Sequence, residues 1–143
     1  MSTPPPFSPV VMLLTVSRVW EAALTDALKP LGLTPRKYGL LGHVRGTPGI
    51  SFSELARRSR ITVQSAHSAV AAFVTAGLVD DMTAHAGAAS RLRVTPEGDA
   101  LLARAAEAVT RLDAEFAARH PELTDTLRAE MARMTSAPRE SSR

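Results

Sequence analysis

Apolar side chains recur every three or four residues along several stretches of the chain, which is the spacing of one face of an α-helix. One such stretch lies near the N-terminus and two lie near the C-terminus. The apolar positions with this spacing are Val10, Leu14, Leu24, Leu28, Leu101, Leu112, Phe116, Leu123, Leu127, Met131 and Met134. The pattern therefore predicts amphipathic helices at both ends of the chain, each with an apolar face to bury.

Helix-start signals divide the rest of the chain. Thr34, Thr95 and His120 each precede a proline, an arrangement that places a cap before a proline at the first helical position. Ser51 and Glu54 form a capping-box pattern, in which Ser51 accepts from the third amide and Glu54 reaches back. Together with glycine breakers, these signals predict helices over residues 8–29, 35–46, 52–59, 63–76, 96–118 and 121–135.

Residues 91–95 break the helical period, because polar and apolar side chains alternate there as they do in a half-buried strand. Residues 78–83 are the expected partner strand. Residues 84–90, which are Ala, His, Gly and Ser only, are the expected tip. The order of four helices, a hairpin and two helices predicts a mainly α fold with a small β-hairpin.

Basic side chains are concentrated in the middle of the chain. The 143 residues suit one domain and carry a formal net charge of only +3. Residues 34–95, however, hold eight Arg or Lys against three Asp or Glu, a balance of +5. The segments before and after carry balances of 0 and −2. A central basic excess is expected where a polyanion is bound, although chance scatter of arginines is the alternative.

Several classes of protein are not supported by the sequence. There is no cysteine, no basic segment at the N-terminus typical of a signal peptide, and no apolar run of the ~20 residues that span a bilayer. We expect a cytoplasmic protein without membrane contact. No phosphate-binding loop, nucleophile elbow or dinucleotide fingerprint is present, so neither an enzyme with catalytic residues nor a cofactor is expected. A metal site at Asp80, Asp81 and His85 is less expected than solvated side chains.

Residues 53–79 outline a helix-turn-helix. A short capped helix is followed by a turn at residues 59–61 and by a longer helix that ends at Gly77, a plausible C-cap. In that motif the second helix lies in the major groove of double-stranded DNA, and its early residues face the bases. The expected DNA contacts are Gln64, Ser65, His67 and Ser68, with Arg57, Arg58, Arg60, Arg91 and Arg93 on phosphates. Two ordinary helices of an all-α domain are the alternative.

Four segments, taken in order and spacing, resemble the MarR family of winged helix-turn-helix transcription regulators. They are Leu31-Gly32-Leu33-Thr34-Pro35-Arg36-Lys37-Tyr38-Gly39-Leu40-Leu41, Ser53-Glu54-Leu55-Ala56, Phe73 through Gly77-Leu78-Val79, and Val94-Thr95-Pro96-Glu97-Gly98. The resemblance implies a ligand-responsive repressor that binds a pseudo-palindromic operator as a homodimer. Residues 8–33 and 96–135 would form the dimerisation helices of one MarR-like domain spanning 1–143. Residues 34–95 would form the DNA-binding region, and residues 1–7 and 136–143 flexible ends.

The same resemblance directs attention to two further sites. The apolar stripes predict a dimer interface that includes Val10, Leu14, Leu112, Phe116, Leu123 and Leu127. A small aromatic or phenolic ligand is implied near Trp20, Tyr38 and His43, although core packing is the simpler interpretation of these three residues.

The chain departs from the family pattern at two places. Ala86 and Ala88 stand where the family carries an Asp and an Arg at the wing tip, and Ser68 stands where an Arg is usual. The predicted recognition helix contains no Arg or Lys at all. An alternative function is therefore a helical dimerisation or adaptor protein with degenerate DNA binding.

Overall fold

The computed structural model describes residues 2–82 and 91–136 of the chain. Its elements are α1 (Pro9–Leu28), the 3-10 turn η1 (Lys29–Leu31), α2 (Pro35–Gly46), α3 (Phe52–Ser59), α4 (Val63–Thr75), β1 (Val79–Asp81), β2 (Leu92–Val94), α5 (Pro96–Arg119) and α6 (Pro121–Ser136). The six helices predicted from sequence are confirmed to within one residue at each end. The wing-tip positions Ala86 and Ala88, and His85, lie outside the described residues.

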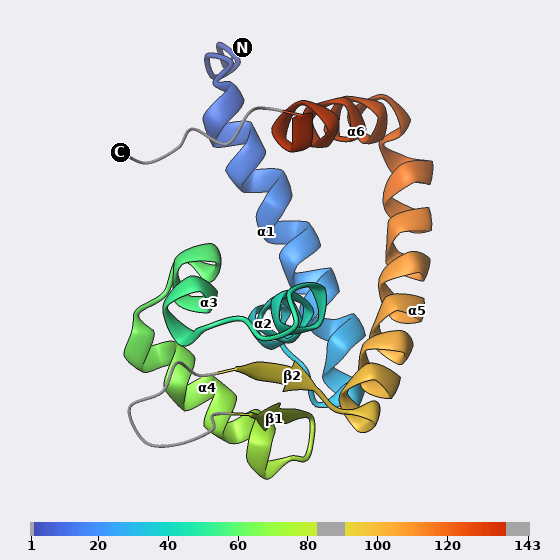
Figure 1. Cartoon of the computed structure of the whole chain (residues 1–143). Coiled ribbons are helices and arrows are strands. Elements are labelled where there is room, and N and C mark those ends of the chain that lie inside the picture. The colour runs from blue at the N-terminus through green and yellow to red at the C-terminus, as the bar shows by residue number, and fades with distance from the viewer. Residues whose placement is uncertain (1, 83–90, 137–143) are drawn as a thin grey trace, which may run out of the picture.

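The elements form two regions that share α5 (Figure 1). Helices α1 and α5 meet near the foot of the molecule and diverge upward, and α6 turns away from the far end of α5. Helices α2, α3 and α4 and the two strands form a second region on the lower side. The mainly α fold with a small β-hairpin, as predicted, is confirmed.

Side-chain caps explain where the helices begin. Five polar residues each accept a hydrogen bond from an amide three residues further on, which satisfies a group that the helix itself leaves unpaired. These caps are Ser8, Thr34, Ser51, Thr62 and Thr95. The predicted capping box forms only in part: Ser51 accepts from the Glu54 amide, but the Glu54 carboxylate binds Arg57 and Arg58 instead of reaching back.

Strands β1 and β2 pair antiparallel, with Val79 opposite Val94 and Asp80 opposite Arg93. A further bridge, which the sequence did not predict, joins Ile50 to Leu92. The Gly49 amide donates to the Leu92 carbonyl over 2.9 Å, and the Leu92 amide donates back to Ile50 over 3.3 Å. The hairpin is thus attached to the segment between α2 and α3.

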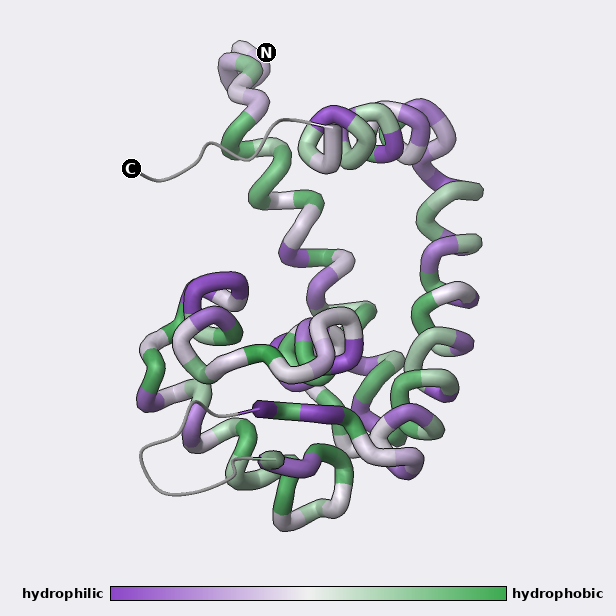
Figure 2. Tube along the Cα trace, viewed as in Figure 1, coloured by the Kyte–Doolittle hydropathy of each residue, from purple (hydrophilic) through white to green (hydrophobic). Residues whose placement is uncertain are grey.

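Most buried apolar side chains lie in the region formed by α2, α3, α4 and the two strands. One core cluster joins α2, α3, α4 and both strands to α5, and its fully buried centre includes Leu41, Leu55 and Leu92. A smaller cluster of Leu28, Leu33 and Ala105 lies where the end of α1 meets α5. By contrast, the first half of α1 is largely apolar (Figure 2), and most of its large apolar side chains are exposed.

A hydrogen-bonded junction joins the end of α4 to the start of α5. Gly77 has a φ of 75°, a left-handed conformation that glycine adopts without a steric penalty. The hydroxyl of Thr95 donates to the Gly77 carbonyl over 2.6 Å and accepts from the Gly98 amide over 3.1 Å. A Cβ at Gly98 would lie 2.3 Å from the Leu78 carbonyl oxygen, so only glycine fits this close approach.

Among the described residues, the helices are all too short or too polar to cross a membrane.

Candidate nucleic-acid interface and neighbouring cavities

Helix α4 has one buried and one exposed face. Ala66, Val70 and Phe73 are buried in the core. Gln64, His67 and Ser68 are exposed on the opposite side, so three of the four predicted base-reading side chains are accessible. Ser65 differs, because it is half-buried and its amide and hydroxyl both bind Thr62 at the N-cap.

The imidazole of His67 stacks on the ring of Phe52, the first residue of α3. The ring centroids are 3.7 Å apart and the planes are inclined by only 20°. Phe52 is half-buried against the main core cluster, so the stack connects the exposed face of α4 to a fixed support. Sequence analysis missed this contact, because the two residues are far apart in the chain and no local pattern joins them.

Glu54 neutralises part of the predicted phosphate-binding surface. Its carboxylate accepts from Nε of Arg57 at 2.9 Å and from Nε of Arg58 at 2.7 Å. These hydrogen bonds lower the pKa of Glu54 to about 2 and raise the pKa of Arg57. Arg58 is further held by a 2.7 Å hydrogen bond to the Thr47 hydroxyl, whereas the Arg57 side chain remains largely exposed.

The other three predicted phosphate contacts lie at the turn and on the wing. Arg60 ends α3 in a left-handed conformation with a φ of 53° and is exposed. Arg91 and Arg93 are also exposed, and Arg93 lies opposite Asp80 across the hairpin. In the part of the chain that the structure describes, Arg60 and Arg91 have no acidic partner.

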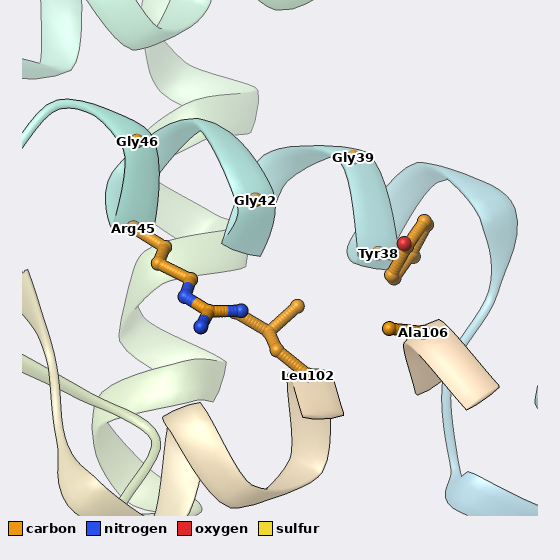
Figure 3. A pocket seen from close by; sticks show the side chains of 7 residues that line it. All are labelled: Tyr38, Gly39, Gly42, Arg45, Gly46, Leu102 and Ala106. Carbon is orange, nitrogen blue, oxygen red and sulfur yellow. The ribbon is translucent and has the colours of Figure 1, made fainter. Parts of the chain in front are cut away.

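A cavity of about 450 Å³ lies between α2 and α5 (Figure 3). Tyr38 stands at one end and Arg45 at the other, with Leu102 and Ala106 of α5 facing them. Three glycines line the α2 side: Gly39, Gly42 and Gly46. Nε of Arg45 lies 3.3 Å from the carboxylate of Asp99 at the start of α5.

The three residues predicted near a ligand do not share one cavity within this chain. Only Tyr38 lines the α2–α5 cavity. Trp20 lines a separate hollow of about 330 Å³ between α1 and α5, with its ring 4.9 Å from that of Phe116 in an edge-on arrangement. His43 lines a third hollow of about 270 Å³ with Arg36 and Arg58. The sequence analysis did not predict the α2–α5 cavity. The signal that could have indicated it is the spacing of Gly39, Gly42 and Gly46, which places all three glycines on one face of α2.

The residues predicted for a dimer interface fall into two groups. Val10, Leu14 and Leu127 are exposed by 65%, 53% and 47%. Leu112, Phe116 and Leu123 are half-buried within the chain itself. Further exposed apolar side chains on α1 and α6, which the sequence analysis did not single out for this surface, are Val11, Met12, Leu13, Val19, Met131 and Met134.

No group of three or more His, Asp or Glu side chains able to hold a metal ion is found within residues 2–82 and 91–136.

Comparison with known proteins gives a consistent result. A family model described as MarR family matches residues 31–85. The HTH-type transcriptional repressors Mb2911 of Mycobacterium bovis and Rv2887 of Mycobacterium tuberculosis are each 32% identical over 124 residues, covering 86% of this chain and 87% of the relative.

Solved structures agree with the family match. The DNA complex of Rv2887 covers 92% of this chain and all of that one, with a TM-score of 0.74 and 26% identity. Its salicylic acid complex covers 93% of this chain and 97% of that one, with a TM-score of 0.67 and 30% identity. MarR from E. coli shares the fold at a TM-score of 0.75 and 15% identity, covering 93% of this chain and all of that one.

The fold, with its capped helix pair, exposed α4 face and attached hairpin, is that of a winged helix-turn-helix regulator that binds DNA. Together with the relatives that match over most of its length, it shows that the chain belongs to the MarR family of transcription regulators.

Proposed function

We propose that this chain is a repressor that binds a pseudo-palindromic operator as a homodimer and leaves it when a small aromatic or phenolic acid binds. The observation that carries the proposal is the exposed polar face of α4 beside the hairpin. In this proposal the protein acts in the cytoplasm and has neither catalytic residues nor a cofactor.

A homodimer would cover apolar surface that one chain leaves in water. Helices α1 and α6 hold most of the exposed large apolar side chains, including Val10, Leu14 and Leu127. The first half of α1 and the whole of α6 lie on the side of the molecule away from the strands (Figure 1). A surface of this kind on a small regulator is typical of a self-complementary interface around a two-fold axis. Residues 8–33 and 96–135 supply these helices, and residues 34–95 supply the DNA-binding region.

DNA would be held mainly by side chains outside α4. Gln64, His67 and Ser68 face the bases, while Arg57, Arg58, Arg60, Arg91 and Arg93 contact phosphates. Because phosphate contacts supply most of the affinity and nearly all of its salt dependence, the neutral α4 leaves that task to the arginines around it.

The ligand site is assigned to the cavity between α2 and α5. Its walls are apolar, the Tyr38 hydroxyl can hydrogen-bond, and the Arg45 guanidinium can pair with a carboxylate. These groups suit an aromatic acid with one negative charge. The related Rv2887 has been crystallised with salicylic acid and with p-aminosalicylic acid. Trp20 and His43 line two neighbouring hollows, so a ligand in this cavity would not contact them directly.

One observation favours the alternative of an adaptor protein with degenerate DNA binding. Glu54 already occupies Arg57 and Arg58, and α4 supplies no positive charge. The test is a fluorescence-anisotropy titration of the full-length protein with duplex DNA from its own upstream region, at several salt concentrations. Binding at least 1,000-fold tighter than to scrambled DNA is expected, with release by salicylate. Equal affinity for both duplexes would favour the adaptor function.

A further inference from the structure

The stack of His67 on Phe52 is unusual among the exposed side chains of α4 because it fixes the position of a ring. An exposed histidine ordinarily samples several rotamers, and binding a base then costs the entropy of selecting one of them. Here one face of the imidazole lies 3.7 Å from the Phe52 centroid, nearly parallel to it. Phe52 is itself held against the main core cluster.

Stacking leaves the edge of the imidazole available. The two ring nitrogens lie in the plane of the ring, so contact with Phe52 covers a face but blocks neither nitrogen. In the described part of the chain, the His67 side chain makes no hydrogen bond, and the residue is exposed. A neutral imidazole offers one N–H donor and one acceptor, and purines present their N7 acceptor in the major groove.

The composition of α4 increases the importance of this one side chain. Gln64 and Ser68 are the other exposed polar residues of its first turns, and neither has a ring contact or a side-chain hydrogen bond in the described structure. The helix has no Arg or Lys with which to grip guanine. His67 is therefore the pre-oriented donor at the base-facing end of α4.

We infer that Phe52 is a positioning residue for His67, and that the held imidazole donates to N7 of one purine in each operator half-site. The inference rests on the proposed DNA-binding function and adds to it a named base-reading pair. Phe52 touches no base in this arrangement. It acts by holding His67 at the start of α4.

The experiment removes the N7 acceptor from DNA one position at a time. Operators are first selected with wild-type protein from a random duplex library, and each purine of a half-site is then replaced by its 7-deaza analogue. We expect one position at which the replacement weakens wild-type binding by about 3- to 10-fold. With His67→Ala the replacement at that position should have no effect.

Variants at Phe52 test the positioning role. The penalty is the logarithm of the fold-loss in affinity caused by the 7-deaza replacement. Phe52→Leu should reduce this penalty to less than half of its wild-type value. Phe52→Tyr, which preserves the ring, should retain it. Thr75→Ala, an exposed change at the far end of α4, is the matched control and should keep the full penalty. Thermal melting of each variant shows that the changes in specificity occur in folded protein.

Two outcomes overturn the inference alone. One is a 7-deaza penalty that is the same in wild type and His67→Ala at every position. The other is a penalty that depends on His67 but is unchanged by Phe52→Leu, which would remove the positioning role. If no operator is enriched from the library at all, the proposed function itself fails, and the inference fails with it.

Discussion

Glu54 shows how a single carboxylate can limit a binding surface. It lies on α3 beside two arginines that the proposed interface needs, and its hydrogen bonds hold both guanidinium groups against the helix. In the proposed complex, the same carboxylate would face phosphates of like charge. Helix stability and DNA affinity therefore place opposite demands on this position.

Glu54→Gln is expected to strengthen DNA binding by several-fold, because it removes a negative charge and frees Arg57. The fall of log affinity with log salt concentration should also become steeper, since each added phosphate contact adds about 0.9 to the magnitude of that slope. Glu97→Gln, an exposed change in the first turn of α5, is the control. Unchanged affinity and slope for Glu54→Gln would show that Arg57 and Arg58 do not touch DNA.

Acid titration provides an independent measure of the same carboxylate. The pKa of Glu54 is lowered from 4.5 to about 2 in the folded chain, so its ionised form stabilises the fold above about pH 4.5. That contribution is lost as the pH falls from about 4.5 towards 2. Wild type and Glu54→Gln should therefore converge in stability only within this acidic range.

At the scale of elements, the turn between α3 and α4 combines two demands in one residue. Arg60 ends α3 with a φ of 53°, in the left-handed region that costs a non-glycine residue about 1–2 kcal/mol. A glycine would remove that cost, yet an arginine occupies the position and is exposed beside the recognition helix.

Arg60→Gly should therefore change stability and binding in opposite directions. The free energy of unfolding, measured with urea, should rise by up to about 1 kcal/mol. DNA affinity should fall, and the slope of log affinity against log salt concentration should decrease in magnitude by about 0.9, the value of one phosphate contact. Arg60→Ala serves as the control, because it removes the charge without relieving the backbone. A variant that is more stable and binds DNA as well as wild type would remove Arg60 from the interface.

Local signals account for most of what the sequence predicts correctly. Three helices start at caps that the sequence predicted, Thr34, Ser51 and Thr95, so their boundaries follow from residues a few positions apart. Contacts between distant segments were not accessible in this way. The bridge from Ile50 to Leu92 and the stack of Phe52 on His67 depend on how α3 packs, which no short pattern encodes. The local sequence likewise does not show that Trp20, Tyr38 and His43 line three different hollows. These lie between α1 and α5, between α2 and α5, and between α2 and α3.

For the molecule as a whole, the uncovered faces of α1 and α6 make assembly testable. Sedimentation velocity at micromolar concentration should show a dimer for wild type. Leu14→Glu, which places a charge on an exposed apolar position of α1, should give a folded monomer with much weaker operator binding, because the second half-site is lost. Asp26→Asn, which changes the charge by one unit at an exposed position near the other end of α1, is the control. A wild-type monomer would contradict the proposed assembly.

The junction at Thr95 turns α5 into a lever arm. Its 24 residues extend over about 36 Å, and its first turn is tied by the Thr95 hydroxyl to the end of α4. A tilt of about 5° along that length displaces one end by about 3 Å, close to the 3.4 Å rise of one base pair on a DNA strand. In a dimer joined at the far ends of these helices, binding of a small molecule between α2 and α5 could tilt α5 by a few degrees. A tilt of that size would move the two recognition helices away from the spacing of successive turns of the double helix.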